Sequence, residues 1–180
     1  MVTIIFESHG TTYDNEIQLS SGWYDAELSA LGIKQAKELG ARYQSEKFDA
    51  IFCSGLQRSC RTAEIAFGGK GMPIMKDTRL KECDYGSLTR HPSNEVESLK
   101  KIYIANPFPN GESYQQTTKR MGDFLKTLLA DYDGKRVMII GHRATQYGLE
   151  HWIKKIPLED VVVAPWKWQS GWIYHLEKLF

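Results

Sequence analysis

The chain has 180 residues, of which 42% are hydrophobic and 25% charged, as is typical of a globular domain with a buried core. Lysine and arginine (23) nearly balance aspartate and glutamate (22), which argues against the strongly basic surface of a nucleic-acid-binding or membrane-surface protein. Because no apolar run approaches the about 20 residues that cross a bilayer, we expect one cytoplasmic domain over residues 1–180.

The first half of the chain alternates predicted strands and helices. The apolar run 2–6 is typical of a strand buried on both faces, and a polar loop follows it as far as Glu27. Ser29 is placed to cap the next helix. The apolar residues at helical spacing there are Leu31, Ala36, Leu39 and Tyr43. Residues 49–53 predict a second strand, and residues 56–67 predict a second helix.

The second half continues this alternation after a less regular middle. Residues 80–109 mix charges with glycine and proline, so we expect loops there with one helix near 95–105. The other predicted elements are a short apolar piece at 74–75, an amphipathic helix after Ser113, a strand at 136–140, a helix at 144–153, and one or two edge strands drawn from 161–163 and 172–176. Alternating strands and helices indicate an α/β layer architecture.

The cysteines and histidines show neither a disulfide framework nor a metal-binding pattern. Cys53, Cys60 and Cys83 are odd in number and form no Cys-x-x-Cys motif, so free thiols are expected. The five histidines lack the spacing of metal ligands, such as two histidines four residues apart on one helix. We therefore expect neither a metal ion nor another cofactor.

Two histidines far apart in the sequence each follow a predicted strand. His9 comes after the strand at 2–6, and His142 comes after the strand at 136–140. Parallel strands place their carboxyl ends at one edge of a sheet, where ligands bind. A single histidine at a strand end is more often structural, but two of them at one edge suggest a built site.

An arginine and a loop add anion-binding groups to this edge. Arg58 lies in the first turn of a helix that follows a strand, where free amides and the helix dipole already favour an anion. Its guanidinium is planar and permanently charged, which suits phosphate. A surface arginine is the simpler alternative, and Arg61 is interpreted in that way. Near His9, the hydroxyl and amide of Thr12 are further candidate donors to an oxyanion.

A carboxyl group in the middle loop is a candidate proton donor. Glu82 lies between Leu80 and Tyr85, and apolar neighbours raise the pKa of a carboxyl group. A solvated loop carboxylate is the alternative interpretation of Glu82. Asp84 competes for the same role, and spacing alone does not separate the two acids.

Together these motifs resemble the histidine phosphatase superfamily, the phosphoglycerate mutase-like family. That family opens with Arg-His-Gly after its first strand, where this chain has Ser8-His9-Gly10, and Asn15 matches a family asparagine. The other matching segments, in the family's order, are 21–29, 54–58 with 62–63, 80–86, 111–113 and 141–142. The resemblance implies a three-layer α/β/α sandwich with a mostly parallel sheet.

The resemblance also implies a mechanism, in which a small phosphomonoester is hydrolysed through a phosphohistidine at His9. Arg58 and His142 would hold the phosphoryl oxygens, and Glu82 would protonate the leaving oxygen and then activate water. The expected catalytic residues are His9, Glu82 and His142, and the expected substrate-binding residues are Arg58, Asn15, Ser21, Gly22, Thr12 and Arg143.

Ser8 departs from the family pattern, because it removes a permanently charged phosphate ligand. Loss of one transition-state donor typically lowers a rate about 100- to 1,000-fold. Three explanations are open: another cation reaches the site, the substrate is less negative or carries its own cation, or the site only binds. The candidate cations are Arg143, Arg90 and Arg61.

The alternative to a phosphatase is a catalytically impaired module that binds a phospholigand or regulates a partner. A phosphoglycerate mutase is less expected, because only about sixty residues separate Glu82 from His142, and Cys83 stands where such mutases carry arginine. Aromatic residues gather near the end of the chain, at Trp166, Trp168, Trp172 and Tyr174. They suggest core or edge-strand packing, or else a homodimer interface. Trp23 and Tyr24 are expected to rim the pocket.

Overall fold

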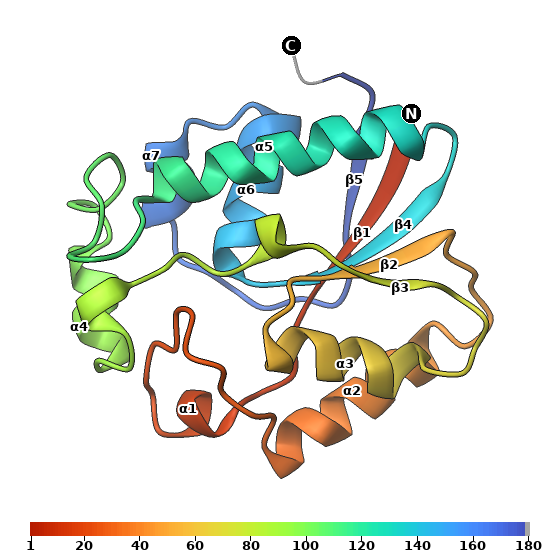
Figure 1. Cartoon of the computed structure of the whole chain (residues 1–180), viewed down its shortest axis with the longest axis horizontal. Coiled ribbons are helices and arrows are strands. Elements are labelled where there is room, and N and C mark those ends of the chain that lie inside the picture. The colour runs from red at the N-terminus through yellow and green to blue at the C-terminus, as the bar shows by residue number, and fades with distance from the viewer. Residues whose placement is uncertain (179–180) are drawn as a thin grey trace.

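The computed structural model describes residues 1–178 and contains a five-stranded sheet with helices on both faces (Figure 1). Its strands are β1 (Val2–Ser8), β2 (Ala50–Cys53), β3 (Ile74–Lys76), β4 (Arg136–Gly141) and β5 (Trp172–Leu176). The strand order is β3-β2-β4-β1-β5, and only β5 runs antiparallel to its neighbour. The predicted α/β fold with a mostly parallel sheet is confirmed.

The helices connect successive strands, as the alternation in the sequence predicts. They are α1 (Tyr13–Glu16), α2 (Ala30–Arg42), α3 (Gln57–Phe67), α4 (Ser93–Leu99), α5 (Tyr114–Asp131), α6 (Arg143–Lys154) and α7 (Leu158–Val163). Local capping determines two of their starts. The Ser29 hydroxyl accepts the Gly32 amide at α2, and the Ser113 hydroxyl accepts the Gln116 amide at α5.

The alternating side chains of the buried strands define two core layers. In β4, Val137 and Ile139 pack toward α5 and α6, whereas Met138 and Ile140 pack toward α2 and α3. Figure 1 shows these two pairs of helices on opposite faces of the sheet. Because successive strand residues point to opposite faces, an unbroken apolar run of this kind requires a sheet covered on both sides.

Two expectations about local structure need correction. Residues 161–163 belong to α7, because Val161 and Val162 pack with Leu158 in a third apolar cluster, and within residues 1–178 no strand pairs with them. The helix expected near 95–105 begins earlier and ends at Leu99.

The register of the parallel strands gathers three loops at one edge of the sheet. Ser8 of β1 pairs with Gly141 of β4, and Cys53 of β2 pairs with Ile140 of β4. The segments that follow these strands therefore start side by side, and they contain the two strand-end histidines and Arg58. Among the described helices, none is long and apolar enough to cross a membrane.

Candidate active site

A cavity of about 620 Å³ opens at the carboxyl edge of the sheet. Eight of the nine site residues proposed from the sequence line it: His9, Asn15, Ser21, Gly22, Arg58, Glu82, His142 and Arg143. The ninth, Thr12, does not line it, because its buried hydroxyl accepts the Asn15 amide at the start of α1. The structure thus places Thr12 as a support for Asn15.

The two histidines face each other across the strand ends. The centroids of the His9 and His142 rings lie 5.1 Å apart. The His9 Nδ1 atom lies 2.7 Å from the carbonyl oxygen of Gly10. A carbonyl oxygen can only accept, so Nδ1 carries the proton and Nε2 keeps a free lone pair. His9 is therefore held in the tautomer that a nucleophilic imidazole requires.

Gly10 lets this loop approach helix α2 closely. A Cβ atom at Gly10 would lie 2.6 Å from the carbonyl oxygen of Gly32, a distance that side chains do not tolerate. Gly10 also donates its amide to the hydroxyl of Thr62 in α3. The loop that carries His9 is therefore fixed against both helices on that face of the sheet.

A hydroxyl group orients His142 in the opposite tautomer. The Ser54 Oγ atom lies 2.7 Å from Nε2 of His142 and accepts the amide of Leu56. Among the described residues, Nε2 is the one acceptor within hydrogen-bond distance of the Ser54 hydroxyl, so the hydroxyl donates to Nε2 and the ring proton of His142 lies on Nδ1. That Nδ1 atom is buried and has no hydrogen-bond partner among the described residues. It is a donor available to a ligand oxygen.

Burial keeps both imidazoles neutral. It lowers the pKa of His9 to about 3, and the charge of Arg58 contributes to the same shift. Burial also lowers the pKa of His142 well below its ordinary value, with Arg58 and His9 as further causes. The site therefore holds one neutral imidazole with a lone pair and one neutral imidazole with a free N–H.

Arg58 is the buried cation of the site. Its side chain donates to the carbonyl oxygens of Tyr24 at 3.0 Å and Gly22 at 2.7 Å. Within residues 1–178 no carboxylate forms a salt bridge with it, so its charge remains available to an anion. The two carbonyl contacts also fasten the loop around Gly22, whose φ of +50° suits glycine.

Backbone amides aim the carboxyl group of Glu82. Its Oε1 atom accepts the amide of Cys83 at 2.7 Å and the amide of Ala144 in the first turn of α6 at 3.3 Å. Glu82 is buried apart from an 8% exposed fraction and lines the cavity. The carboxyl group thus lines the same cavity as the two histidines while most of the Glu82 side chain is buried.

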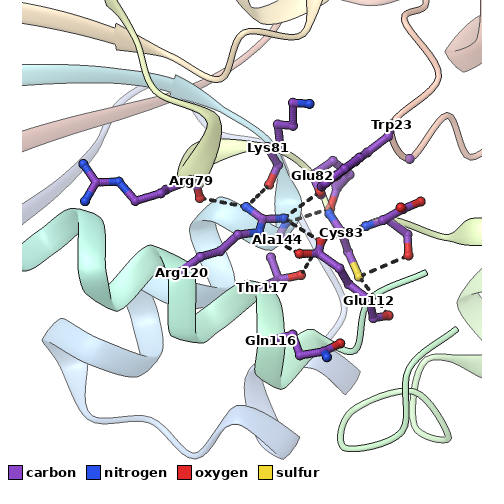
Figure 2. Close-up of polar contacts among 12 residues, drawn as sticks. Trp23, Arg79, Lys81, Glu82, Cys83, Glu112, Gln116, Thr117, Arg120 and Ala144 are labelled. Atoms are coloured by element: carbon purple, nitrogen blue, oxygen red, sulfur yellow. Dashed lines mark hydrogen bonds and ion pairs between the residues drawn. The ribbon is translucent and has the colours of Figure 1, made fainter. Parts of the chain in front are cut away.

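A network behind Glu82 holds its main chain in place, as Figure 2 shows. The Glu82 carbonyl accepts the indole N–H of Trp23 at 2.7 Å and a guanidinium N–H of Arg120 at 2.8 Å. Arg120 also donates to the carbonyls of Arg79 and Lys81, and Glu112 binds it with two hydrogen bonds. One partly buried arginine therefore binds three carbonyl groups of the segment 79–82 and fixes the main chain that leads to Glu82.

The sequence did not reveal Arg120, although it singled out the segment that contains Glu112. Arg120 immediately precedes the buried Met121 on an amphipathic helix. A charged residue at such a position is expected to face solvent, so the sequence pattern does not indicate a role in the site. Trp23 was expected to rim the pocket, but neither it nor Tyr24 is among the residues that line the cavity. Trp23 instead supports Glu82 from behind.

The structure narrows the candidates for a cation that replaces the missing arginine. Arg61 pairs with Glu64 on the exposed face of α3, and Arg90 pairs with Asp14. Neither of these arginines lines the cavity, so these two suggestions were wrong. Arg143 does line it and binds Glu97 at 2.6 Å.

Arg42 is a third cation on the cavity wall, after Arg58 and Arg143, and the sequence gave no signal for it. It lies at the end of α2 and binds the buried carboxylate of Glu7 at 2.7 Å. Burial raises the pKa of Glu7, while Tyr43 and Arg42 oppose that shift. Arg42 is thus anchored by the residue that directly precedes Ser8.

The described residues contain no group of three or more histidine, cysteine, aspartate or glutamate side chains that could hold a metal ion. The cavity wall carries two imidazoles, three guanidinium groups and four carboxyl groups, and two of the guanidinium groups are each paired with one of the carboxyl groups. The part of the wall formed by His9, Arg58 and His142 suits an oxyanion such as a phosphoryl group, because it combines directed N–H donors with a positive charge that is not paired with a carboxylate of the described residues.

The fold and this edge of the sheet are those of the histidine phosphatase superfamily. The model of the histidine phosphatase superfamily (branch 1) matches residues 4–169, and the chain belongs to that superfamily.

Individual relatives include both phosphatases and mutases. The chain is 34% identical to the uncharacterized phosphatase PhoE of Bacillus subtilis over 149 residues, which cover 83% of this chain and 76% of that protein. It is 29% identical to the phosphoglycerate mutase of Schizosaccharomyces pombe over an alignment of 191 positions, which covers 97% of this chain and 90% of that protein. Among solved structures, Bacillus stearothermophilus YhfR superposes with a TM-score of 0.84 at 26% identity, covering 97% of this chain and 95% of that one.

Proposed function

We propose that this protein hydrolyses a small phosphomonoester through a phosphohistidine at His9. The observation that carries the proposal is the state of His9. This residue is neutral, is tied through Nδ1 to the Gly10 carbonyl, and presents the lone pair of Nε2 beside Arg58 and His142. A neutral and oriented imidazole is the form of histidine that attacks phosphorus.

In the first step, Nε2 of His9 forms a bond to phosphorus while the bond from phosphorus to the leaving oxygen breaks. Glu82, in its protonated form, gives its proton to that oxygen. The phosphorylated imidazole becomes cationic, and its Nδ1–H remains bonded to the Gly10 carbonyl, which stabilises it. Arg58 and Nδ1–H of His142 donate to the phosphoryl oxygens, where charge develops in the transition state.

In the second step, water attacks the phosphohistidine. Glu82, now a carboxylate, accepts a proton from the attacking water, and Nε2 of His9 leaves with its electron pair. The products are inorganic phosphate and the starting enzyme. The network around Arg120 supports this exchange, because it fixes the Glu82 main chain while one end of its carboxyl group faces the cavity.

Ser8 favours one alternative, a module that binds a phospholigand with little or no turnover. The chain lacks an arginine directly before His9 in the sequence, and the two cations on the cavity wall besides Arg58 are each paired with a carboxylate. Binding a phosphate group in its ground state does not require the additional positive charge that stabilises the transition state of phosphoryl transfer. This alternative predicts phosphate binding in the absence of hydrolysis.

The test is hydrolysis of 4-nitrophenyl phosphate between pH 5 and pH 8 by the wild-type chain and by His9→Ala. The proposal expects turnover by the wild type and loss of at least about 1,000-fold in the variant. Binding of inorganic phosphate to both proteins is measured in parallel by calorimetry. Equal turnover in the two proteins would reject His9 as the nucleophile, and phosphate binding without turnover in either would favour the binding module.

A further inference from the structure

The cavity is much larger than a phosphoryl group needs. Its volume of about 620 Å³ lies in the range of sites that hold whole small molecules. The phosphate-directed groups, His9, Arg58 and His142, occupy one part of the wall. The remainder of the wall is therefore free to contact the part of the substrate that leaves with the oxygen.

Two tryptophans form one end of this wall. Trp166 and Trp168 lie on the segment between α7 and β5, and both line the same cavity as His9. Figure 1 shows this segment crossing below the carboxyl ends of the central strands. Because β5 pairs with β1 in antiparallel fashion, with Trp172 opposite Phe6, the chain just before β5 passes close to the end of β1.

Trp166 is a fixed part of this wall. Its ring stacks on Trp172 with centroids 6.2 Å apart and an interplanar angle of 28°. Its indole N–H donates to the side-chain carbonyl of Gln146 at 2.6 Å. The guanidinium of Arg143 lies 5.5 Å from its ring centroid. These three contacts hold Trp166 in one orientation.

Trp168, in contrast, presents a large open surface. It is 58% exposed although it lines the cavity. An indole that borders a ligand cavity and is left open to solvent gains free energy when a flat ring covers it, through burial of apolar area and aromatic stacking. The small side chain of Ser8 lines the same cavity, so the wall at the end of β1 keeps room for such a ring.

We infer that Trp168, which lines the cavity together with the fixed Trp166, forms a stacking subsite for a planar aromatic or heteroaromatic ring in the leaving group of the phosphomonoester. The inference deepens the proposed function, because it names the substrate class of the same cavity. Stacking on a single aromatic side chain changes affinity about 5- to 150-fold, and we therefore expect a contribution of at least about fivefold in Kd.

The test compares ligands that differ in the ring and share the phosphate. The pairs are phenyl phosphate against cyclohexyl phosphate, and adenosine 5′-monophosphate against ribose 5-phosphate. The aromatic ring is close to the phosphate group in the first pair and farther from it in the second. Affinities are measured by calorimetry in a His9→Asn background, where phosphoryl transfer does not consume the ligand. The second protein combines His9→Asn with Trp168→Ala.

We expect the ring to improve Kd at least about fivefold in at least one pair, and we expect Trp168→Ala to abolish that advantage. Ligands without the ring should bind both proteins alike. Gln169→Ala serves as the matched control, because Gln169 is exposed on the same segment and does not line the cavity. It should keep the ring preference.

Two outcomes would overturn the subsite: equal affinity for ringed and ringless ligands in both pairs, or a ring preference that survives Trp168→Ala. The proposed phosphatase function is tested separately by turnover in the chain that retains His9. A protein that prefers ringed ligands but hydrolyses none of them would retain the subsite and lose the phosphatase function.

Discussion

The neutral state of His9 has a measurable effect on stability. An unfolded chain protonates this histidine near pH 6.5, whereas burial lowers its pKa in the folded protein to about 3. Between these two values the unfolded state binds a proton that the folded state does not. The free energy of unfolding must therefore fall as the pH drops below 6.5, and the loss continues toward pH 3.

The magnitude follows from the two pKa values. Each pH unit below the unfolded-state pKa removes about 1.4 kcal/mol for a histidine that stays neutral in the fold, so His9 removes about 2 kcal/mol between pH 7 and pH 5. The pKa of His142 is also lowered by burial, so His142 changes the stability in the same direction.

The perturbation is His9→Asn, because the asparagine amide can keep a hydrogen bond near the position of Nδ1 and does not titrate. Urea unfolding of the wild type and the variant is measured at several pH values from 7 to 5. The gap in unfolding free energy should move by about 2 kcal/mol in favour of the variant as the pH falls. Taking the difference cancels the titration of groups that both proteins share.

Ser113→Ala is the control, since it removes a helix cap that does not titrate. Its gap from the wild type should stay constant with pH. A gap between the wild type and His9→Asn that is the same at pH 7 and pH 5 would refute the reasoning. It would mean that folded His9 binds protons as readily as unfolded His9 does, and the proposed neutral nucleophile would lose its support.

Three further predictions concern the surroundings of the histidines. Glu82→Gln should lower steady-state hydrolysis by about 100- to 10,000-fold, and phosphoenzyme should accumulate in an alkaline quench; unchanged turnover would exclude this carboxyl group as the acid. Ser54→Ala leaves Nε2 of His142 without a donor, so it should cost about 1–3 kcal/mol in urea unfolding and lower kcat/KM; unaltered kcat/KM would show that the hydroxyl does not set the working tautomer. Arg42→Ala leaves the buried Glu7 without its cation, and we expect the free energy of unfolding at pH 7 to fall by about 2–3 kcal/mol. This loss is smaller than that for a fully buried ion pair, because a third of the Arg42 side chain is exposed. Adding Glu7→Gln should recover most of that loss, and a double variant no more stable than Arg42→Ala would contradict this account.

The parts of the fold that the sequence predicted correctly are those governed by local rules. An apolar run gives β1, and a serine cap gives the start of α2. The placement of His9 and His142 also follows from the sequence, because each is next to a strand and parallel strands align their carboxyl ends. A site at that edge could therefore be predicted before any side-chain contact was known.

The errors have one physical cause, which is that packing overrides local preference. Three consecutive valines favour a strand, yet residues 161–163 form a helix because Val161 and Val162 complete an apolar cluster beside α6. The choice among candidate cations was open for the same reason. Whether Arg61, Arg90 or Arg143 reaches the site depends on the direction of each side chain, and sequence spacing does not encode it.

The sequence by itself determined the strand-helix alternation, the family motifs and the edge of the sheet where the chemistry would be found. Only the tertiary structure decided the tautomers of the two histidines, the role of Arg120 behind Glu82, and the positions of Arg42 and Trp168 on the cavity wall. Strands and caps arise from neighbours in the chain, whereas a proton on a particular nitrogen depends on which partner lies within hydrogen-bond distance. That partner comes from a distant segment once the chain has folded, as Ser54 does for His142.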